Sequence, residues 1–428
     1  MSTTASTAPC RWLWQIGLAW GCSVGPLVAQ SYSTDPLADY TSSRLPPTNT
    51  PAVVTAPASA AKPPPPPRFR TFADFAAPDQ LGLALQLDAM GKSPGTDLAG
   101  VLDMLSRLPA DQVGPALGQL SPAGYDAATA AAVDAAHRHL GLVAGYIENS
   151  VAEDVGPWSL WAVGINGSAD GPQADSTSRT AGGAGGGDYH FGRNIRFGFA
   201  FGYTHSTITQ PGNASHGQMD AVNYGSYLTW KFAQGYVEAI FSMVEESFTD
   251  QREINLGQLD RMATSQHDGR GGSGYLGTGY DLTLAGLRLR PNAALEYGRF
   301  HQQAFTETGA GSLNLAIDDQ TDDSLQSHVG LRADYDLPLP GIKLTPRATV
   351  AWGHQFNTDP RTLQARFAQG GTDTFTVHGS PGTADGLETS AGFSAACFGV
   401  NLYADYALTF AGSSGMAHSL QAGLWTKF

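Results

Sequence analysis

Charge is the scarcest property of this sequence. Asp, Glu, Lys and Arg make up only 14 % of its 428 residues, and 38 acidic residues outnumber 24 basic ones. Because proteins bind phosphate backbones through clustered Lys and Arg, this composition argues against a nucleic-acid partner. Cysteine is also scarce, and 3 cysteines are too few for a disulfide framework. The 52 glycines and 10 % aromatic residues instead favour many short strands over a highly helical protein.

Long apolar runs are limited to the N-terminus. An apolar stretch begins directly after Arg11 and ends at Ala29, and no acidic residue occurs before Asp35. A positive start, a short apolar middle and small residues at the end predict a secretory signal peptide over residues 1–29, with cleavage near Ala29. Pro26 argues against the alternative of a buried N-terminal helix.

The next two regions differ in composition. Residues 30–68 are rich in Pro, Ala, Ser and Thr and contain five consecutive prolines at 63–67. Because proline fixes φ and donates no backbone hydrogen bond, this segment is predicted to be extended and disordered, without a core. Residues 69–156 show helical spacing of apolar residues, with short helices first. A longer helix is predicted after Ser121-Pro122, a pair that suits a helix start.

The hydrophobic period switches to two after Pro157. In the stretch Ile195–Thr204, Ile, Phe, Phe, Phe and Tyr occupy the odd positions, whereas Arg, Gly, Ala, Gly and Thr occupy the even ones. A soluble sandwich would bury the bulky face and place charge on the other, but here the second face is small or polar and only lightly charged. Aromatic residues also gather near the predicted strand ends, as a lipid–water interface requires. The pattern therefore predicts strands with lipid outside and a packed or polar lumen inside.

The lengths of the connections indicate the topology. Twelve candidate strands begin near Trp158, Asp188, Ile195, Met219, Tyr236, Gly274, Leu287, Leu325, Lys343, Glu388, Val400 and His418. Tight turns alternate with long polar loops, among them the predicted loops Asp250–Gly272, Glu307–Ser324 and Asn357–Asp385. Outer-membrane barrels place short turns in the periplasm and long loops outside the cell. We therefore predict an all-β transmembrane barrel of twelve antiparallel strands over residues 157–428.

The predicted barrel has room for one helix. Barrels of about eight strands are filled by their own side chains, and those of about sixteen hold a channel. The last helix of residues 69–156 is therefore predicted to plug the pore. By strand parity, the lumen is predicted to contain Arg196, Lys231, Glu238, Arg288, Arg290, Glu296, Arg332, Asp334, Arg347, Asp405 and Lys427.

Motifs for catalysis or cofactor binding are absent from the sequence. No G-x-S-x-G string occurs, and no Ser, His and acidic residue are paired at a recognisable spacing. Gly269–Gly274 matches G-x-G-x-x-G but leads into a predicted strand, so a Gly-rich outer loop is the preferred interpretation. His137 and His139 point to different faces of one helix, and the acidic loop with Asp318 and Asp323 fits a solvated loop better than a Ca²⁺ site. We therefore predict no catalytic residue, no cofactor and no metal.

Several stretches resemble the C-terminal β-domain of the autotransporter family, which carries out type V secretion. They are the approach Ala116–Tyr125, then Trp161, Gly164 and Gly167 in the first strand, Asp188 in the second, Phe305–Glu307 at the end of the seventh, Trp352–Phe356 in the ninth, Phe375–Pro381 before the tenth, and the terminal Gln421–Phe428. The resemblance extends from about Phe69 to the C-terminus.

The resemblance implies an integral barrel in the outer membrane of a Gram-negative-type bacterium, surrounded by lipid and monomeric. It implies periplasmic chaperones and the barrel assembly machinery as partners. The family's assembly signal corresponds here to Gln421, Gly423 and the terminal aromatic Phe428, with Thr426 at a position where the family prefers an apolar residue. Some members cleave themselves at an asparagine in the pore, but Asn149 lacks the paired pattern and we predict no cleavage.

The predicted function is to anchor a short N-terminal segment, or to translocate it to the cell surface. Residues 30–68 would then be a vestigial passenger, and the protein would not be an enzyme. Two other classes stay open. One is an outer-membrane channel for small solutes, and the other is a barrel hydrolase, since an enzyme built from loop residues would leave no local signature.

Overall fold

The structure is a computed structural model. It describes residues 71–90, 96–150, 156–171, 176–211, 215–369, 373–397, 399–412 and 415–428. The predicted signal peptide and Pro-rich segment lie outside the described residues. The described strands form two sheets, a large one and one of four short strands.

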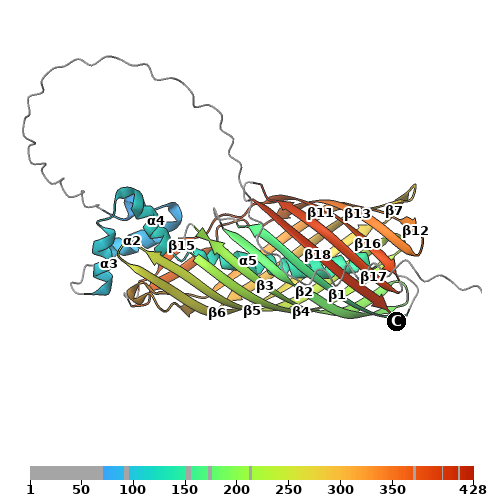
Figure 1. Ribbon diagram of the computed structural model, residues 1–428, viewed down its shortest axis with the longest axis horizontal. Helices are drawn as coiled ribbons and strands as arrows, with labels where there is room; N and C mark the ends of the chain where they lie inside the picture. The colour runs from blue at the N-terminus through green and yellow to red at the C-terminus, as the bar shows by residue number, and fades with distance from the viewer. Residues whose placement is uncertain are drawn as a thin grey trace, which may run out of the picture. The chain divides into compact units, whose positions relative to one another are not determined.

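The large sheet is a closed antiparallel barrel of twelve long strands (Figure 1). In chain order they are β1 (Trp158–Asp170), β2 (Thr177–Phe191), β3 (Ile195–Gln210), β4 (Ser215–Phe232), β5 (Gly235–Asn255), β6 (Asp260–Tyr280), β8 (Leu287–Gln302), β11 (Gln320–Tyr335), β13 (Ile342–Gln355), β16 (Asp385–Cys397), β17 (Val400–Phe410) and β18 (Met416–Lys427). Each pairs with the next, and β18 returns to pair with β1. Two short strands, β7 (Leu282–Leu284) and β12 (Leu337–Leu339), extend hairpins at one end. The predicted barrel is confirmed.

Glycines lie in most of the tight turns at that end of the barrel, and Ala233 takes the same backbone conformation between β4 and β5. Gly192, Gly286, Gly341 and Gly399 all have positive φ, a conformation that glycine adopts without strain. At the opposite end the strands are joined by the longer connections. The two ends therefore differ as the sequence predicts, and the C-terminal Phe428 lies at the short-turn end (Figure 1).

Several strand boundaries differ from the prediction, most of all those of β2, β5 and β6. The predicted loop Asp250–Gly272 is wrong, because β5 and β6 stay paired as far as Asn255 and Asp260. Gly269–Gly274 accordingly lies within β6 and not in an outer loop. Asp188 lies near the end of β2 and does not start it. In both places glycine and polar residues on the strand hide the alternation on which the prediction relied.

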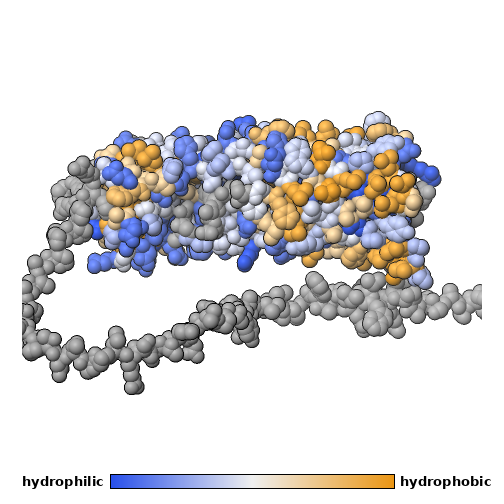
Figure 2. Space-filling model, turned by 90° about the horizontal axis from the view of Figure 1, so that it is seen from above, coloured by the Kyte–Doolittle hydropathy of each residue, from blue (hydrophilic) through white to orange (hydrophobic). Residues whose placement is uncertain are grey.

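The apolar outer surface of the barrel is concentrated toward the short-turn end. Phe199 and Phe201 are 63 % and 59 % exposed, and many other large apolar side chains of the barrel are exposed as well. Figure 2 shows these side chains gathered over the half of the barrel that includes the tight turns. On β5 the outward positions change from Phe241 and Met243 to Glu245 and Ser247 about halfway along its 21 residues. Since a membrane-spanning strand needs about 9–11 residues, the upper half of β5 projects above the lipid.

The N-terminal part of the described chain forms four α-helices. They are α2 (Leu81–Ala89), α3 (Asp97–Leu105), α4 (Ala110–Leu120) and α5 (Gly124–Asn149). None of the described helices is long and apolar enough to cross a bilayer. The 26-residue α5 runs inside the barrel and confirms the predicted pore helix (Figure 1).

The other three helices form a cap at the long-loop end. They pack on the small sheet of β9 (Phe305–Thr306), β10 (Leu315–Ile317), β14 (Thr362–Phe367) and β15 (Phe375–His378). These strands come from two connections predicted to be loops, one after β8 and one after β13. Leu83, Leu87, Leu105, Leu117 and Leu120 are fully buried in the common core, which also takes in Ile254 and Ala263 at the tips of β5 and β6. The cap is therefore a packed unit joined to the barrel rim.

Candidate functional site

The lumen of the barrel and the helix within it form the candidate site. The first half of α5 presents a face of small residues, including Ala128, Ala132 and Ala135. This face packs on Ile208, Met219, Val244 and Phe248 of β3, β4 and β5, together with Phe300 of β8. Because alanine extends only one carbon from the backbone, α5 lies close to this wall. The helix therefore does not sit centrally in the lumen.

A cluster around Asp188 fixes the second half of α5. The hydroxyls of Tyr146 on α5 and Tyr227 on β4 donate to Asp188 Oδ2 over 2.6 and 2.8 Å. The indole Nε1 of Trp161 donates to Tyr227 Oη over 2.8 Å, and its ring stacks on Tyr146 at 4.6 Å. A Cβ at Gly186 would lie 2.8 Å from the Trp161 ring, so glycine provides the space for this indole. Trp161 and Asp188 are two of the residues that resemble the family, and the Tyr227 hydroxyl thus connects them.

Three arginines hold the C-terminal end of α5. Arg332 of β11 bonds Glu148 Oε2 over 2.9 Å and Asn149 Oδ1 over 2.8 Å. Arg347 of β13 donates to the same Asn149 oxygen, and Arg196 of β3 donates to Ser150 Oγ and to the Ile147 carbonyl. A helix C-terminus carries partial negative charge and free carbonyls, which cations stabilise. These arginines therefore seat the helix end at the level of the short turns.

Acidic residues on the barrel wall balance these cations. Arg347 forms a bidentate ion pair with Asp405, with both N–O distances at 2.5 Å. Arg332 forms an ion pair with Asp334 at 2.9 Å. The side chains of all four are buried, as is Glu238. The parity prediction that these residues face a polar lumen is confirmed for them. Asn149 is the last residue of α5, and its side-chain oxygen is held by two guanidinium groups.

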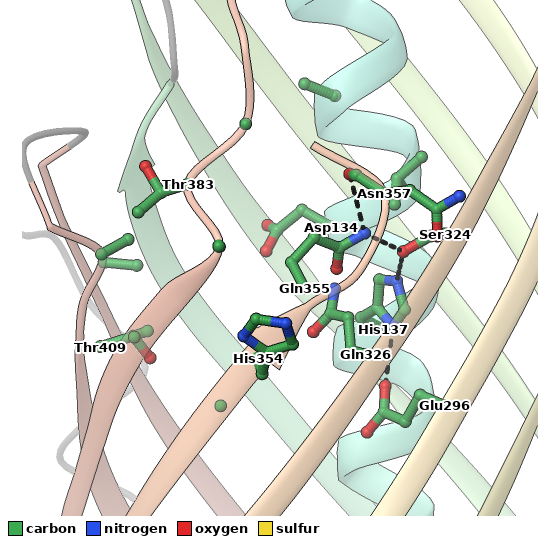
Figure 3. A pocket seen from close by; sticks show the side chains of 18 of the residues that line it. Asp134, His137, Glu296, Ser324, Gln326, His354, Gln355, Asn357, Thr383 and Thr409 are labelled. Atoms are coloured by element: carbon green, nitrogen blue, oxygen red, sulfur yellow. Dashed lines mark hydrogen bonds and ion pairs between the residues drawn. The ribbon is translucent and has the colours of Figure 1, made fainter. Parts of the chain in front are cut away.

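The side of α5 away from the alanine-lined wall borders a cavity of about 830 Å³. Its helical wall includes Asp134, His137 and Arg138, and its other walls come from β8, β11, β13, β16, β17 and β18. Figure 3 shows His137 between Ser324 and Glu296 in this cavity. His137 Nδ1 lies 2.7 Å from Glu296 Oε2, and His137 Nε2 lies 3.0 Å from Ser324 Oγ.

A buried ion pair fastens the cap to the barrel rim. Arg252 at the upper end of β5 donates to both Glu307 carboxylate oxygens, over 2.9 and 2.5 Å. Glu307 also accepts from Tyr125 Oη over 2.9 Å and from the Leu315 amide over 2.7 Å. Arg252 further donates to the Gln119 carbonyl at the end of α4. This one pair therefore connects β5, the small sheet, α4 and the first turn of α5.

A second, more exposed contact joins α3 to the rim. Both Asp97 carboxylate oxygens accept from Arg261, over 2.7 and 2.6 Å, and Ser312 Oγ donates to Asp97 over 2.7 Å. The Arg261 guanidinium and the Ser312 hydroxyl hold the pKa of Asp97 well below its usual value of 3.8. The carboxylate is thus kept ionised in the docked cap.

The predicted assembly residues lie along the seam where β18 meets β1. Phe428 and Trp158 exchange two backbone hydrogen bonds, at 3.0 and 3.3 Å, and the Phe428 side chain is 60 % exposed. A Cβ at Gly423 would lie 2.4 Å from the Tyr403 ring, so this ring packs directly over the glycine. Gln421 faces the lumen beside Asp405, 3.5 Å away. Ala29, the predicted cleavage point, lies outside the described residues.

The other candidate positions have local partners. Asp318 pairs with Arg366 at 2.7 Å, and Asp322 pairs with Arg361 at 2.7 Å. Asp323 bonds Tyr297 on the outer face, so these aspartates do not converge. Within the part of the chain that the structure describes, no three His, Cys, Asp or Glu side chains are grouped to hold a metal ion.

Comparison with known proteins identifies the family. The family model for the autotransporter beta-domain matches residues 160–407, which is more than half of the chain. The chain belongs to the autotransporter β-domain family. The fold is similar to that of the translocator domain of autotransporter NalP from Neisseria meningitidis, with a TM-score of 0.56 and 18 % identity over 70 % of this chain and 98 % of that one. As a member of this family, the present chain is an integral barrel of the Gram-negative outer membrane.

Two curated relatives match about half of the sequence. Both are named extracellular serine protease, from Serratia marcescens, and are 27 % identical over 237 residues and 25 % identical over 236 residues. Each match covers 54 % of this chain but only 22 % of the relative. The chain therefore spans less than a quarter of the length of these relatives, and their protease name describes them alone.

Proposed function

We propose that this autotransporter carries residues 30–68 through its barrel and displays them at the cell surface. The cap formed by α2–α4 and the small sheet would mark the point where the exported chain emerges. Helix α5 would stay in the pore as the anchor. Neither anchoring nor translocation requires a catalytic residue in the barrel.

The direction of α5 is the observation that carries this proposal. Its first residue, Gly124, lies beside Ser215 at the long-loop end, whereas its last, Asn149, bonds Arg332 and Arg347 near the short turns. Since outer-membrane barrels place long loops outside the cell, this direction puts the described residues before Gly124 on the outer side and supports export of the segment that precedes them. The packed cap lies at the same long-loop end, which supports this orientation of the chain.

We further propose that the barrel assembles as a monomer with the help of periplasmic chaperones and the barrel assembly machinery. Gln421, Gly423 and Phe428 would carry the assembly signal. Their position on the closing seam supports this, because a strand that must pair last is the one that an assembly factor has to hold.

Surface proteolysis of whole cells with mass mapping tests the proposal. Residues 30–68 are expected to be removed by an added protease while the barrel stays intact. A periplasmic reporter protein serves as the control for membrane integrity. Protection of residues 30–68 in cells that pass this control would show that they stay in the periplasm, which would contradict the proposal.

The channel alternative predicts a different electrical behaviour. Because α5 and its partners fill much of the lumen, the intact protein is expected to be nearly silent in planar bilayers. Deletion of residues 120–156 is expected to raise the conductance. High conductance of the intact chain would favour a solute channel instead.

A further inference from the structure

We propose that Ser324, His137 and Glu296 form an acyl-transfer site in the lumen that hydrolyses small, polar carboxylic esters. This activity would be separate from translocation. The three residues come from β11, α5 and β8, so that closure of the barrel around α5 brings them together. No sequence pattern could reveal the site, since 159 residues separate His137 from Glu296.

The two contacts of His137 have the arrangement of a nucleophile, a base and a carboxylate. A carboxylate only accepts hydrogen bonds, so Glu296, 2.7 Å from Nδ1, holds the imidazole proton on that nitrogen. Nε2 is then left to accept, and Ser324 Oγ lies 3.0 Å from it. In the serine hydrolases the base takes the hydroxyl proton through the nitrogen that faces the serine, while the acid orients the ring through the other.

A third contact orients the Ser324 hydroxyl. Gln355 Nε2 donates to Ser324 Oγ over 3.3 Å. Because a hydroxyl has a single proton, a lone pair engaged by Gln355 leaves that proton for His137. Gln355 Nε2 also donates to the Asn357 carbonyl over 3.3 Å, so the amide is held in this orientation from both sides.

The surroundings of Ser324 indicate the class of substrate. Ser324, His137 and Glu296 all line the cavity of about 830 Å³, a volume in the range of small-molecule sites. Asp134, Arg138, Glu388 and His354 also line it, so its walls are polar. Asp323 and Tyr297, which bond each other on the outer face beside Ser324, place the site near the outer edge of the lipid band. A short acyl chain fits this environment, and a long lipid chain does not.

The reaction is an ordinary two-step hydrolysis. Ser324 Oγ attacks the ester carbonyl as its proton moves to His137 Nε2, and a new C–O bond forms. The ester C–O bond then breaks, and the alcohol leaves with the proton from His137. A water molecule from the cavity attacks the acyl-serine, releases the carboxylic acid and restores the Ser324 hydroxyl.

Labelling with a small fluorophosphonate tests the site in the full chain, folded in detergent. Wild-type protein is expected to be modified at Ser324, as mapped by mass spectrometry, and to hydrolyse p-nitrophenyl acetate. Ser324→Ala is expected to lose both activities. Ser206→Ala is the matched control, because Ser206 is a buried serine of β3 that bonds Thr180 and does not line this cavity, and it is expected to behave as wild type. Heat modifiability reports that each variant is folded.

Glu296 is a positioning residue, and Glu296→Gln distinguishes this role from a structural one. The amide keeps the size of the side chain and still accepts a hydrogen bond, so a purely structural contact would leave labelling unchanged. Loss of the orienting charge is instead expected to slow labelling by up to about 10⁴-fold. His137→Gln is expected to slow it by about 10²- to 10⁴-fold.

Two results would overturn the proposal. One is folded wild-type protein that the fluorophosphonate does not modify at Ser324. The other is ester hydrolysis at the wild-type rate by folded Ser324→Ala. In either case the three residues would be only a polar contact between α5 and the barrel wall.

Discussion

Glu307→Gln is the most informative single substitution in the cap. Glu307 and Arg252 are only 1 % and 2 % exposed, and the carboxylate also accepts from Tyr125 and Leu315. Glutamine keeps the shape of the side chain but removes the charge. Arg252 then remains buried without its ion-pair partner, and the two contacts that join it to residue 307 lose their charge.

The expected cost follows from the burial of this pair. Removal of one partner of a buried ion pair destabilises a protein by about 3–5 kcal/mol. This corresponds to a factor of about 10² to 10⁴ in the equilibrium for opening of the cap. Hydrogen exchange of the α2–α4 amides in the detergent-folded chain measures that factor, and the barrel amides serve as an internal reference.

Asp323→Asn is the matched control for loss of a carboxylate charge. Its partner Arg299 lies 3.5 Å away, and the two side chains are 40 % and 64 % exposed, so the expected cost is below about 1 kcal/mol. The double variant Arg252→Met, Glu307→Met removes both charges and is expected to recover part of the protection, because the Tyr125 hydroxyl and the Leu315 amide still lose their acceptor. If Glu307→Gln changed cap exchange no more than Asp323→Asn, the buried pair would not hold the cap.

Three further predictions concern the seam and the rim. Deletion of Phe428 is expected to reduce the amount of heat-modifiable barrel in the outer membrane, and normal amounts would refute its role in assembly. Gly423→Val is expected to lower the yield of folded barrel, because a Cβ there lies 2.4 Å from the Tyr403 ring; Gly274→Val, whose nearest contact is 3.8 Å, is the control. Because the pKa of Asp97 is lowered in the docked cap, its carboxylate stabilises the cap above pH 3.8, the usual pKa, and this stabilisation is lost as the pH falls below 3.8. Hydrogen exchange of the cap is therefore expected to rise below pH 3.8 in the wild type. The Asp97→Asn variant is expected to show no such additional rise.

The barrel could be predicted from the sequence because its signal is local. The alternation in Ile195–Thr204 needs no knowledge of distant residues, and the same parity places Arg332 and Arg347 in the lumen. Local signals fail where glycine or polar residues occupy both faces, as on β6, and the predicted boundaries are wrong there.

The cap and the lumen contacts depend on long-range packing instead. The strands β10 and β14 have three and six residues, too few to show a period, and they pair across more than forty residues. Glu307 lies in a stretch that resembles the family, but its partner Arg252 lies 55 residues away in the sequence, so the ion pair could not be predicted. Ser324 and His137 likewise become neighbours only when the barrel closes on α5.

The seam between β1 and β18 constrains the order in which the molecule can form. At one end of the seam Trp158 pairs with Phe428, so groups that are 428 − 158 = 270 positions apart in the sequence must meet. The other strand pairs of the described barrel join neighbours along the chain, so this closure links a far longer stretch of sequence than any of them. Until the final strand arrives, β1 keeps an unpaired edge in a medium that cannot hydrate it. If the C-terminal residues direct assembly as proposed, a chain that lost its last few residues is expected to stall as an open ribbon.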